Sequence, residues 1–259
     1  MKEVKSKHKS TSELLLPILF IILMLLVWEI YVRAAGVDQT VLPSPSRIVA
    51  ALWYARSDLL NNTLYTLLET AIGLIISIIV GSFLAILIDI SKLVDRTLYP
   101  VLVVSQTIPM VALAPLLVLW FGFGLAPKVI VVVLVTFFPI VVAMVDGLRS
   151  TDRELIKLLK TMGANRLQTL TKVQLPASLP YLFSGIKVGV TYGVIGAIFG
   201  EYVGAYQGLG ILIQTAKNSF RTDLVFAAIC VTALLSIGLF WLTNLVERKL
   251  IPWHAKATS

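Results

Sequence analysis

Long stretches of apolar residues constrain this chain more than any other feature of its sequence. A membrane-spanning α-helix needs about 20 predominantly apolar residues, because the hydrocarbon core of a bilayer is about 30 Å thick. Several stretches approach or exceed that length in this chain, which is 58% hydrophobic and only 14% charged. Soluble domains contain about 25% charged residues on average. The sequence therefore predicts an all-α membrane protein that crosses the bilayer several times.

Six spanning helices account for these stretches. The first has about 19 apolar residues, more than a signal peptide's usual 7–15, and no Ala-x-Ala cleavage site follows it, so we expect it to be retained. The expected organisation is a basic tail at 1–13, spans at 14–32, 64–88, 98–120, 128–145, 181–203 and 224–246, an external loop at 33–63, a polar loop at 147–180 and a basic tail at 247–259.

Prolines and charges suggest the form of several connections. Pro43 and Pro45 disfavour helix in the middle of the external loop, so we favour a solvated loop there over a short interfacial helix at Ile48–Tyr54. Residues 89–98 are predicted to form a charged turn. Residues 201–223 contain several glycines and are predicted to form a structured external loop that resembles no phosphate-binding motif.

The longest polar segment is the loop between the fourth and fifth spans, TDRELIKLLKTMGANRLQTLTKVQLPASLP, residues 151–180. Thr151 and Glu154 have the spacing of a capping box, and Gly163 is a typical residue to end a helix. A second short helix is expected from about Arg166 to Val173, ending at Leu175-Pro176. Apolar side chains recur at helical spacing on one side of the first helix, at Leu155, Leu158, Leu159 and Met162.

This loop carries a family resemblance. Gly163, followed nine residues later by Val173-Gln174-Leu175-Pro176, resembles the cytoplasmic signature loop of permease subunits of binding-protein-dependent ABC importers. The resemblance runs from about Leu42 to Trp253 and is greatest for the sulfonate, nitrate, taurine and pyrimidine-precursor branch. It implies the type I importer permease fold, with a coupling helix that docks into an ATPase. The family's loop usually opens Glu-Ala-Ala, where this chain has Lys157-Leu158-Leu159.

The resemblance also implies partners. It predicts an ABC ATPase subunit that binds ATP and Mg²⁺, an external solute-binding protein, a second permease copy and membrane lipid. This chain is predicted to hold no cofactor or metal, to bind no nucleic acid despite its net charge of +8, and to have no catalytic residue, since it lacks a P-loop and a Gly-x-Ser-x-Gly motif. The implied ATPase-docking residues are Glu154, Leu155, Lys157, Leu158, Lys160, Met162, Gly163, Ala164, Asn165 and Arg166.

The distribution of basic residues predicts the orientation. With the N-terminus inside, the inner segments hold 16 Lys and Arg and the outer segments hold 6. This bias fits the positive-inside rule, which places both termini and the polar loop in the cytoplasm of a cell-membrane protein. The polar loop, counted together with Lys187 near the inner end of the fifth span, supplies seven of the 16, so it largely decides the prediction.

Polar and small residues within the spans suggest a pathway. The third span contains Pro100, Pro109 and Pro115, so a broken, pathway-lining helix and a packed kink are both compatible with it. A glycine stripe along the fifth span predicts close helix packing at the bundle centre, at the subunit interface or beside the pathway. The candidates are Glu69, Gln106, Thr107, Pro109, Gly189, Gly193, Gly196 and Gly200.

Ionisable residues at membrane depth are costly, at about 3 kcal/mol near the bilayer centre. Glu29 and Glu201 lie near outer ends and are expected to reach water, and Lys187 is expected to snorkel to the inner surface. Glu69 is the deepest of them, and pairing with a polar neighbour is slightly favoured over a direct role in transport. Cys230, the only cysteine, is expected to be buried.

The cargo and the energy source leave alternatives. The spans offer no central basic side chain to attract an anion, which favours a small heterocycle, such as a pyrimidine precursor or riboflavin, over sulfonate, taurine or nitrate. Backbone dipoles also bind anions, so the second class stays open. A channel or scaffold that does not use ATP is the alternative to a transporter subunit.

Overall fold

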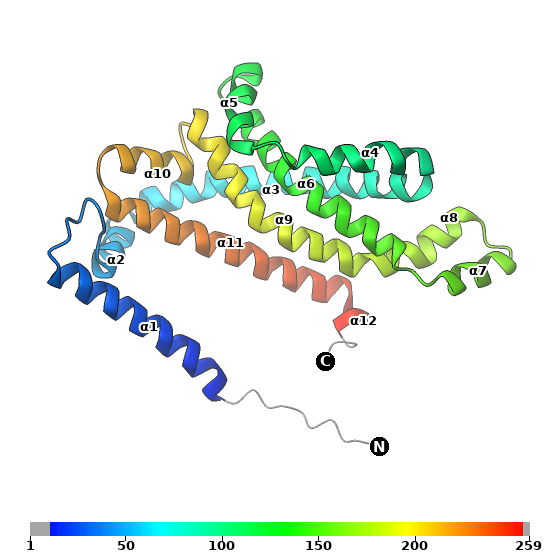
Figure 1. Ribbon diagram of the computed structural model, residues 1–259, viewed down its shortest axis with the longest axis horizontal. Helices are drawn as coiled ribbons and strands as arrows, with labels where there is room; N and C mark the ends of the chain where they lie inside the picture. Colours follow the sequence, from blue (N-terminus) through cyan, green and yellow to red (C-terminus); the bar gives the residue numbers. More distant parts are fainter. Residues whose placement is uncertain (1–10, 256–259) are drawn as a thin grey trace.

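The computed structural model describes residues 11–255, and within them every regular element is helical (Figure 1). The helices are α1 Thr11–Ala34, α2 Pro45–Tyr54, α3 Arg56–Ile90, α4 Lys92–Ser105, α5 Met110–Phe121, α6 Leu125–Arg149, α7 Arg153–Thr161, α8 Arg166–Thr169, the π-helix η1 Leu170–Gln174, α9 Leu175–Gly204, α10 Leu209–Asn218, α11 Thr222–Leu250 and α12 Pro252–Ala255.

Five helical runs in the described residues are long and apolar enough to cross a membrane: α1, α3, α6, the continuous run Arg166–Gly204, and α11. The pair α4 and α5 qualifies as a sixth span only when both halves are taken together, and its halves are bent by 99°. The break falls at residues 106–109, where Pro109 has an extended backbone and is the N-cap residue of α5. The predicted all-α membrane fold is confirmed. Of the two alternatives for the third span, a broken helix and a packed kink, the structure has the broken helix.

The centre of the bundle is formed by α3, α6 and α9, and α9 runs back along α6 (Figure 1). Glycines allow this close contact. A Cβ atom on Gly185 would lie 2.8 Å from the carbonyl oxygen of Pro139, and one on Gly196 would lie 2.6 Å from a methyl carbon of Val135. The predicted glycine stripe therefore packs α9 against α6 of the same chain.

The predicted external loop at 33–63 is wrong as a loop over most of its length. Only residues 35–44 and Ala55 lie between helices, because α2 spans Pro45–Tyr54 and α3 begins at Arg56. Proline fits the first turn of a helix, where its missing N–H is not needed, so Pro45 starts α2 instead of preventing it. Glu29 of α1 accepts hydrogen bonds from the backbone N–H and the hydroxyl of Ser46, at 2.9 and 2.8 Å, and so joins α1 to α2.

The predicted loop at 201–223 is also largely helical. The helix α9 continues to Gly204, and α10 occupies Leu209–Asn218. Leu209 and Ile213 of α10 pack into an apolar cluster with Ile48 of α2 and Ala227 of α11. The short helix α10 therefore packs on the bundle as a lid. Because tertiary contacts hold it there, the local sequence does not predict it.

Four expectations need correction, three about the polar loop and its neighbours and one about Cys230. Asp152, not Thr151, caps α7, since its carboxylate accepts the N–H of Glu154 at 2.8 Å. The second helix does not end at Leu175-Pro176, because the π-turn η1 carries the chain from α8 into α9 and Pro176 lies in the first turn of α9. The charged turn at 89–98 shortens to Ser91. Cys230, expected to be buried, is exposed on α11.

Candidate functional site

The helix α7 projects from one end of the bundle (Figure 1). None of its residues is buried, and the apolar side chains of Leu155, Leu158 and Met162 are 41%, 57% and 75% exposed. Asp152 caps the start of the helix, and Glu154 lies in its first turn, where a carboxylate favours the helix dipole. An exposed apolar stripe on a well-capped short helix is suited to receive another protein.

Gly163 ends α7 as predicted. Its φ of +85° is in the left-handed region, which glycine adopts without the steric cost of a Cβ atom. The N–H of Ala164 donates to the carbonyl of Leu159 at 2.9 Å, and the N–H of Gly163 donates to that of Lys160 at 3.0 Å. These two bonds form a Schellman motif, which fixes the direction in which the chain leaves α7.

The next two predicted docking residues hold the loop in place. The side chain of Asn165 caps α8 and forms a capping box with Gln168. Arg166 donates to the carbonyl oxygens of Asp89 and Ile90, at 3.3 and 2.5 Å, at the C-terminal end of α3. The loop is therefore attached to the α3–α4 corner.

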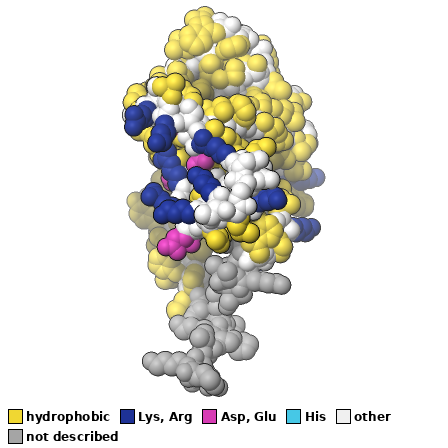
Figure 2. Space-filling model, turned by 90° about the vertical axis from the view of Figure 1, so that its right-hand side faces the viewer, with side chains coloured by type: hydrophobic (Ala, Val, Ile, Leu, Met, Phe, Trp, Pro, Cys, Tyr) yellow, Lys and Arg dark blue, Asp and Glu magenta, His cyan; other side chains and the backbone are white. Residues whose placement is uncertain are grey.

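Basic side chains gather on this end of the molecule (Figure 2). The exposed Lys and Arg residues of the α7–η1 region are Arg153, Lys157, Lys160, Arg166 and Lys172. Close by, Arg149 at the end of α6 forms an ion pair with Asp95 of α4 at 2.6 Å. This end therefore combines a stripe of exposed apolar side chains with surrounding positively charged side chains.

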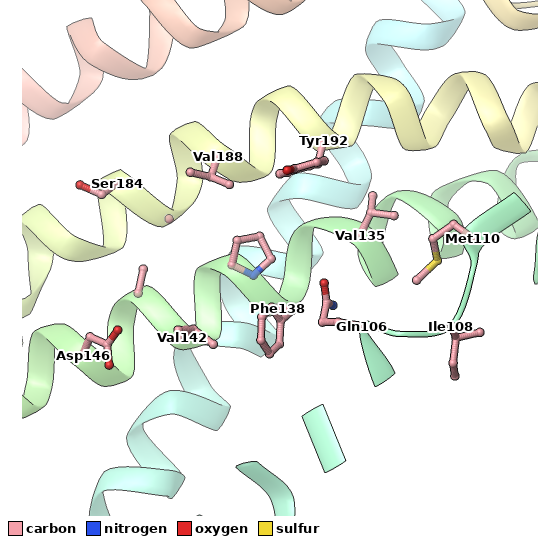
Figure 3. Close-up of a pocket in the computed structure, with 13 residues that line it drawn as sticks. Gln106, Ile108, Met110, Val135, Phe138, Val142, Asp146, Ser184, Val188 and Tyr192 are labelled. Atoms are coloured by element: carbon pink, nitrogen blue, oxygen red, sulfur yellow. The ribbon is translucent and has the colours of Figure 1, made fainter. Parts of the chain in front are cut away.

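A groove of about 600 Å³ lies beside the break between α4 and α5 (Figure 3). Its floor is one face of α6, and its walls are α9 and the residues of the break. Its main lining residues are Val135, Phe138, Pro139, Val142 and Asp146 of α6, Ser184, Val188 and Tyr192 of α9, Gln106 and Ile108 of the break, and Met110 at the start of α5.

The structure brings few of the predicted pathway residues to this groove. Gln106 lines it, whereas Thr107 and Pro109 are exposed in the break without lining it. The four glycines are buried, and their Cα positions face neighbouring helices: Gly189 and Gly193 lie against α6 residues Ile140 and Thr136, Gly196 against Val135, and Gly200 against Lys128. Their position explains helix packing and gives no support to a pathway role.

Glu69 is 1% exposed and forms an ion pair with Lys128 at 2.7 Å, so the favoured reading of a paired carboxylate is confirmed. Lys128, predicted to begin the fourth span and counted with the outer basic residues, lies near the start of α6 and is only 8% exposed. Lys187, expected to snorkel, pairs with Glu247 of α11 at 2.5 Å.

The expectation that Glu201 reaches water is wrong. Its side chain is fully buried and accepts hydrogen bonds from the hydroxyl of Thr66 at 2.6 Å and from the N–H of Gly210 at 2.5 Å. Thr66 also accepts the N–H of Leu209, and Asn62 accepts that of Gly208. Glu201 thus fastens α10 to the bundle. The Gly208-Leu209-Gly210 triplet was the only sequence signal for it, since a side chain at Gly208 or Gly210 would collide with the carboxylate.

A helical bundle with a broken span beside a groove, and an exposed amphipathic helix at one end, defines a membrane transport permease. The chain belongs to the family described as the inner membrane component of binding-protein-dependent transport systems, which matches residues 73–252. Within it, the chain is an ABC importer permease of the sulfonate, taurine and pyrimidine-like branch.

Similar proteins agree with this assignment. The chain is 40% identical to the formylaminopyrimidine transport permease protein ThiX of Halalkalibacterium halodurans, over 96% of this chain and 99% of that protein. It is also 40% identical to the riboflavin transport system permease protein RibX of Chloroflexus aurantiacus, over 91% and 88%. An inward-facing structure of the MetNI methionine ABC transporter matches with a TM-score of 0.60 and 20% identity, over 82% of this chain and 97% of that one, which shows the type I fold alone.

Proposed function

We propose that this chain is the pathway-forming subunit of an ATP-driven importer and that α7 is its docking element for a separate ATPase subunit. The exposed apolar stripe of Leu155, Leu158 and Met162 carries this proposal, because a stripe of this kind is costly in water unless a partner covers it. The partner ATPase would bind ATP and Mg²⁺, since this chain contains no P-loop.

The arrangement of charge supports an orientation. Lys157, Lys160 and Lys172 lie at the α7 end of the bundle, and the cytoplasmic side of a membrane protein is usually enriched in such residues. We place α7 and both termini in the cytoplasm, and the α10 lid outside. A solute-binding protein would deliver cargo to the outer side, and two copies of this chain would form one pathway.

The proposed cargo is a small heterocycle. Two relatives with 40% identity are named for formylaminopyrimidine and riboflavin transport, and both compounds contain flat nitrogen heterocycles. Phe138 and Tyr192 supply aromatic surface in the groove, and among its lining residues none is Lys or Arg. This chemistry favours an uncharged ring over sulfonate, taurine or nitrate.

The test is copurification and uptake with the double variant Leu158→Asp/Met162→Asp. Charging the exposed stripe should abolish binding of the ATPase subunit and ATP-dependent uptake into vesicles, while the permease still folds because neither side chain is buried. The matched control is Leu158→Met/Met162→Leu, which keeps the stripe apolar and should retain both properties. Unchanged ATPase binding in the aspartate variant, or equal uptake without ATP, contradicts the proposal; the latter result would indicate a channel.

A further inference from the structure

The groove beside the α4–α5 break contains chemical features that go beyond those of a passage. Phe138 on its floor and Tyr192 on its α9 wall each present an aromatic ring to it (Figure 3). Tyr192 is 54% exposed, although a large aromatic side chain is normally covered in a finished helix contact. The two rings therefore offer apolar surface on which a flat ligand can stack.

Polar groups lie at separate points along the same groove. The Gln106 amide stands in the helix break, where it offers both a donor and an acceptor to the edge of a ring. Ser184 on α9 and Asp146 on α6 both lie toward the end of the groove that leads to α7 (Figure 3). Within residues 11–255 Asp146 forms no salt bridge, so its negative charge is not neutralised by a neighbour.

The charge of Asp146 decides between the two cargo classes. A carboxylate repels an anion held a few ångströms away, and the repulsion is stronger near a protein surface than in bulk water. Since no Lys or Arg lines the groove to offset it, a sulfonate held beside Ser184 would be disfavoured. An uncharged ring with N–H donors has no such cost, because a carboxylate accepts hydrogen bonds from it.

We propose that this groove is the cargo-binding site of the permease, that Tyr192, Phe138 and Gln106 hold an uncharged heterocycle in it, and that Asp146 excludes anions. The proposal rests on the importer function proposed above and identifies the residues that recognise cargo within the membrane. Tyr192 and Gln106 come from α9 and from the break of the third span, so a change in the bend between α4 and α5 would open or close the site.

Single-cysteine labelling tests this proposal without a binding protein and without ATP. Cys230, the only cysteine of the chain, is replaced by Ser, and Ser184→Cys or Thr191→Cys is then introduced. These two positions are matched: both are exposed on α9, and both hydroxyls bond to the carbonyl four residues earlier, at 3.1 and 3.2 Å. Only Ser184 lines the groove.

The complex of permease and ATPase in lipid nanodiscs is labelled with a maleimide, and the label is read on the permease peptide. Riboflavin or formylaminopyrimidine should slow labelling at position 184 and leave position 191 unchanged, whereas methanesulfonate should protect neither. Tyr192→Ala should raise the protecting concentration by about fivefold or more, as expected for a lost stacking contact, and Tyr192→Phe should not. Asp146→Asn should lower about tenfold the concentration of methanesulfonate that is needed to protect position 184.

Each result is expressed as the ratio of labelling rates with and without ligand, because Asp146→Asn also changes the reactivity of the nearby thiol. Absence of protection by both heterocycles, or equal protection by methanesulfonate in the protein that retains Asp146, overturns the proposed site. An unchanged response of Asp146→Asn overturns the role of that residue. If the complex with Cys230→Ser and Ser184→Cys performs ATP-driven uptake but shows no protection, this inference fails while the proposed importer function stands.

Discussion

Thr66 of α3 donates its hydroxyl hydrogen to the carboxylate of Glu201 on α9 at 2.6 Å, and both residues are fully buried. The same hydroxyl accepts the N–H of Leu209 at 2.9 Å, and the carboxylate accepts the N–H of Gly210 at 2.5 Å. These N–H groups belong to the first turn of α10, where a helix has no acceptors of its own. Side chains from two other helices therefore cap α10, because Gly208 at its N-cap position has none to offer.

Replacing Glu201 by Ala should destabilise the permease by about 2–3 kcal/mol, because it leaves buried donors without an acceptor. The free energy of unfolding in mixed micelles of mild detergent and dodecyl sulfate measures this. Glu154→Ala removes an exposed carboxylate from α7 and should change stability by less than about 0.5 kcal/mol. Equal small effects of both substitutions would show that Glu201 does not hold α10.

Gly208→Ala should be similarly damaging for a steric reason. A Cβ atom there would lie 2.2 Å from the carboxylate carbon of Glu201, and the residue has a φ of +126°. Gly122→Ala is the matched control, since Gly122 has a φ of +75° but no atom within 4 Å of the added carbon. We expect Gly122→Ala to cost about 1–2 kcal/mol, the penalty of the backbone alone, and Gly208→Ala to cost more.

A double-mutant cycle separates the two contributions at Gly208. In the Glu201→Ala background the collision is absent, so Gly208→Ala should cost about as much as Gly122→Ala does in the wild-type protein. Strict additivity of the Gly208 and Glu201 substitutions would contradict the contact between them.

The ion pair between Glu69 and Lys128 should be costly to break from one side only. One carboxylate oxygen of Glu69 accepts from Lys128 at 2.7 Å, and the other is buried without a hydrogen-bond partner in the described residues. Lys128→Met leaves that charge unpaired and should cost about 3–5 kcal/mol in unfolding free energy.

Adding Glu69→Gln to Lys128→Met should restore much of the lost stability, because the double variant no longer buries a charge. Unfolding in mixed micelles compares the three proteins. If Lys128→Met alone is neutral, the pair contributes little, and Glu69 is free for another role.

The parts of this fold that the sequence predicts are those that follow from local chemistry. Apolar length predicts the spans, Pro109 indicates a break or a kink in the third span, and Gly163 predicts the end of α7, because each depends on residues close in the chain. Their physical causes are the bilayer thickness, the missing proline N–H and the steric freedom of glycine.

The parts that were missed depend on contacts between distant residues. Nothing near Glu201 indicates that Thr66, 135 positions earlier in the chain, satisfies its carboxylate. The sequence predicts a span that begins at Lys128, but nothing near Lys128 in the chain indicates that Glu69, on another helix, pairs with it inside the bundle. The glycine stripe predicted a close helix contact, and only the fold identifies the partner as α6.

Arg166 offers a test of how the docking loop acts on the rest of the protein. Its guanidinium donates to the carbonyls of Asp89 and Ile90 at the end of α3, and the chain turns there into α4, which leads to the break beside the groove.

A cation at a helix C-terminus contributes about 0.3–1 kcal/mol, so Arg166→Gln should lower stability only slightly. We nevertheless expect ATP-driven uptake per bound ATPase to fall severalfold, because movement of α7 would no longer reach α3. Lys172→Gln also removes an exposed charge, one that forms no side-chain hydrogen bond within residues 11–255, and it should leave uptake unchanged. Unaltered uptake by Arg166→Gln, with the ATPase still bound, would mean that the force passes through η1 and α9 instead.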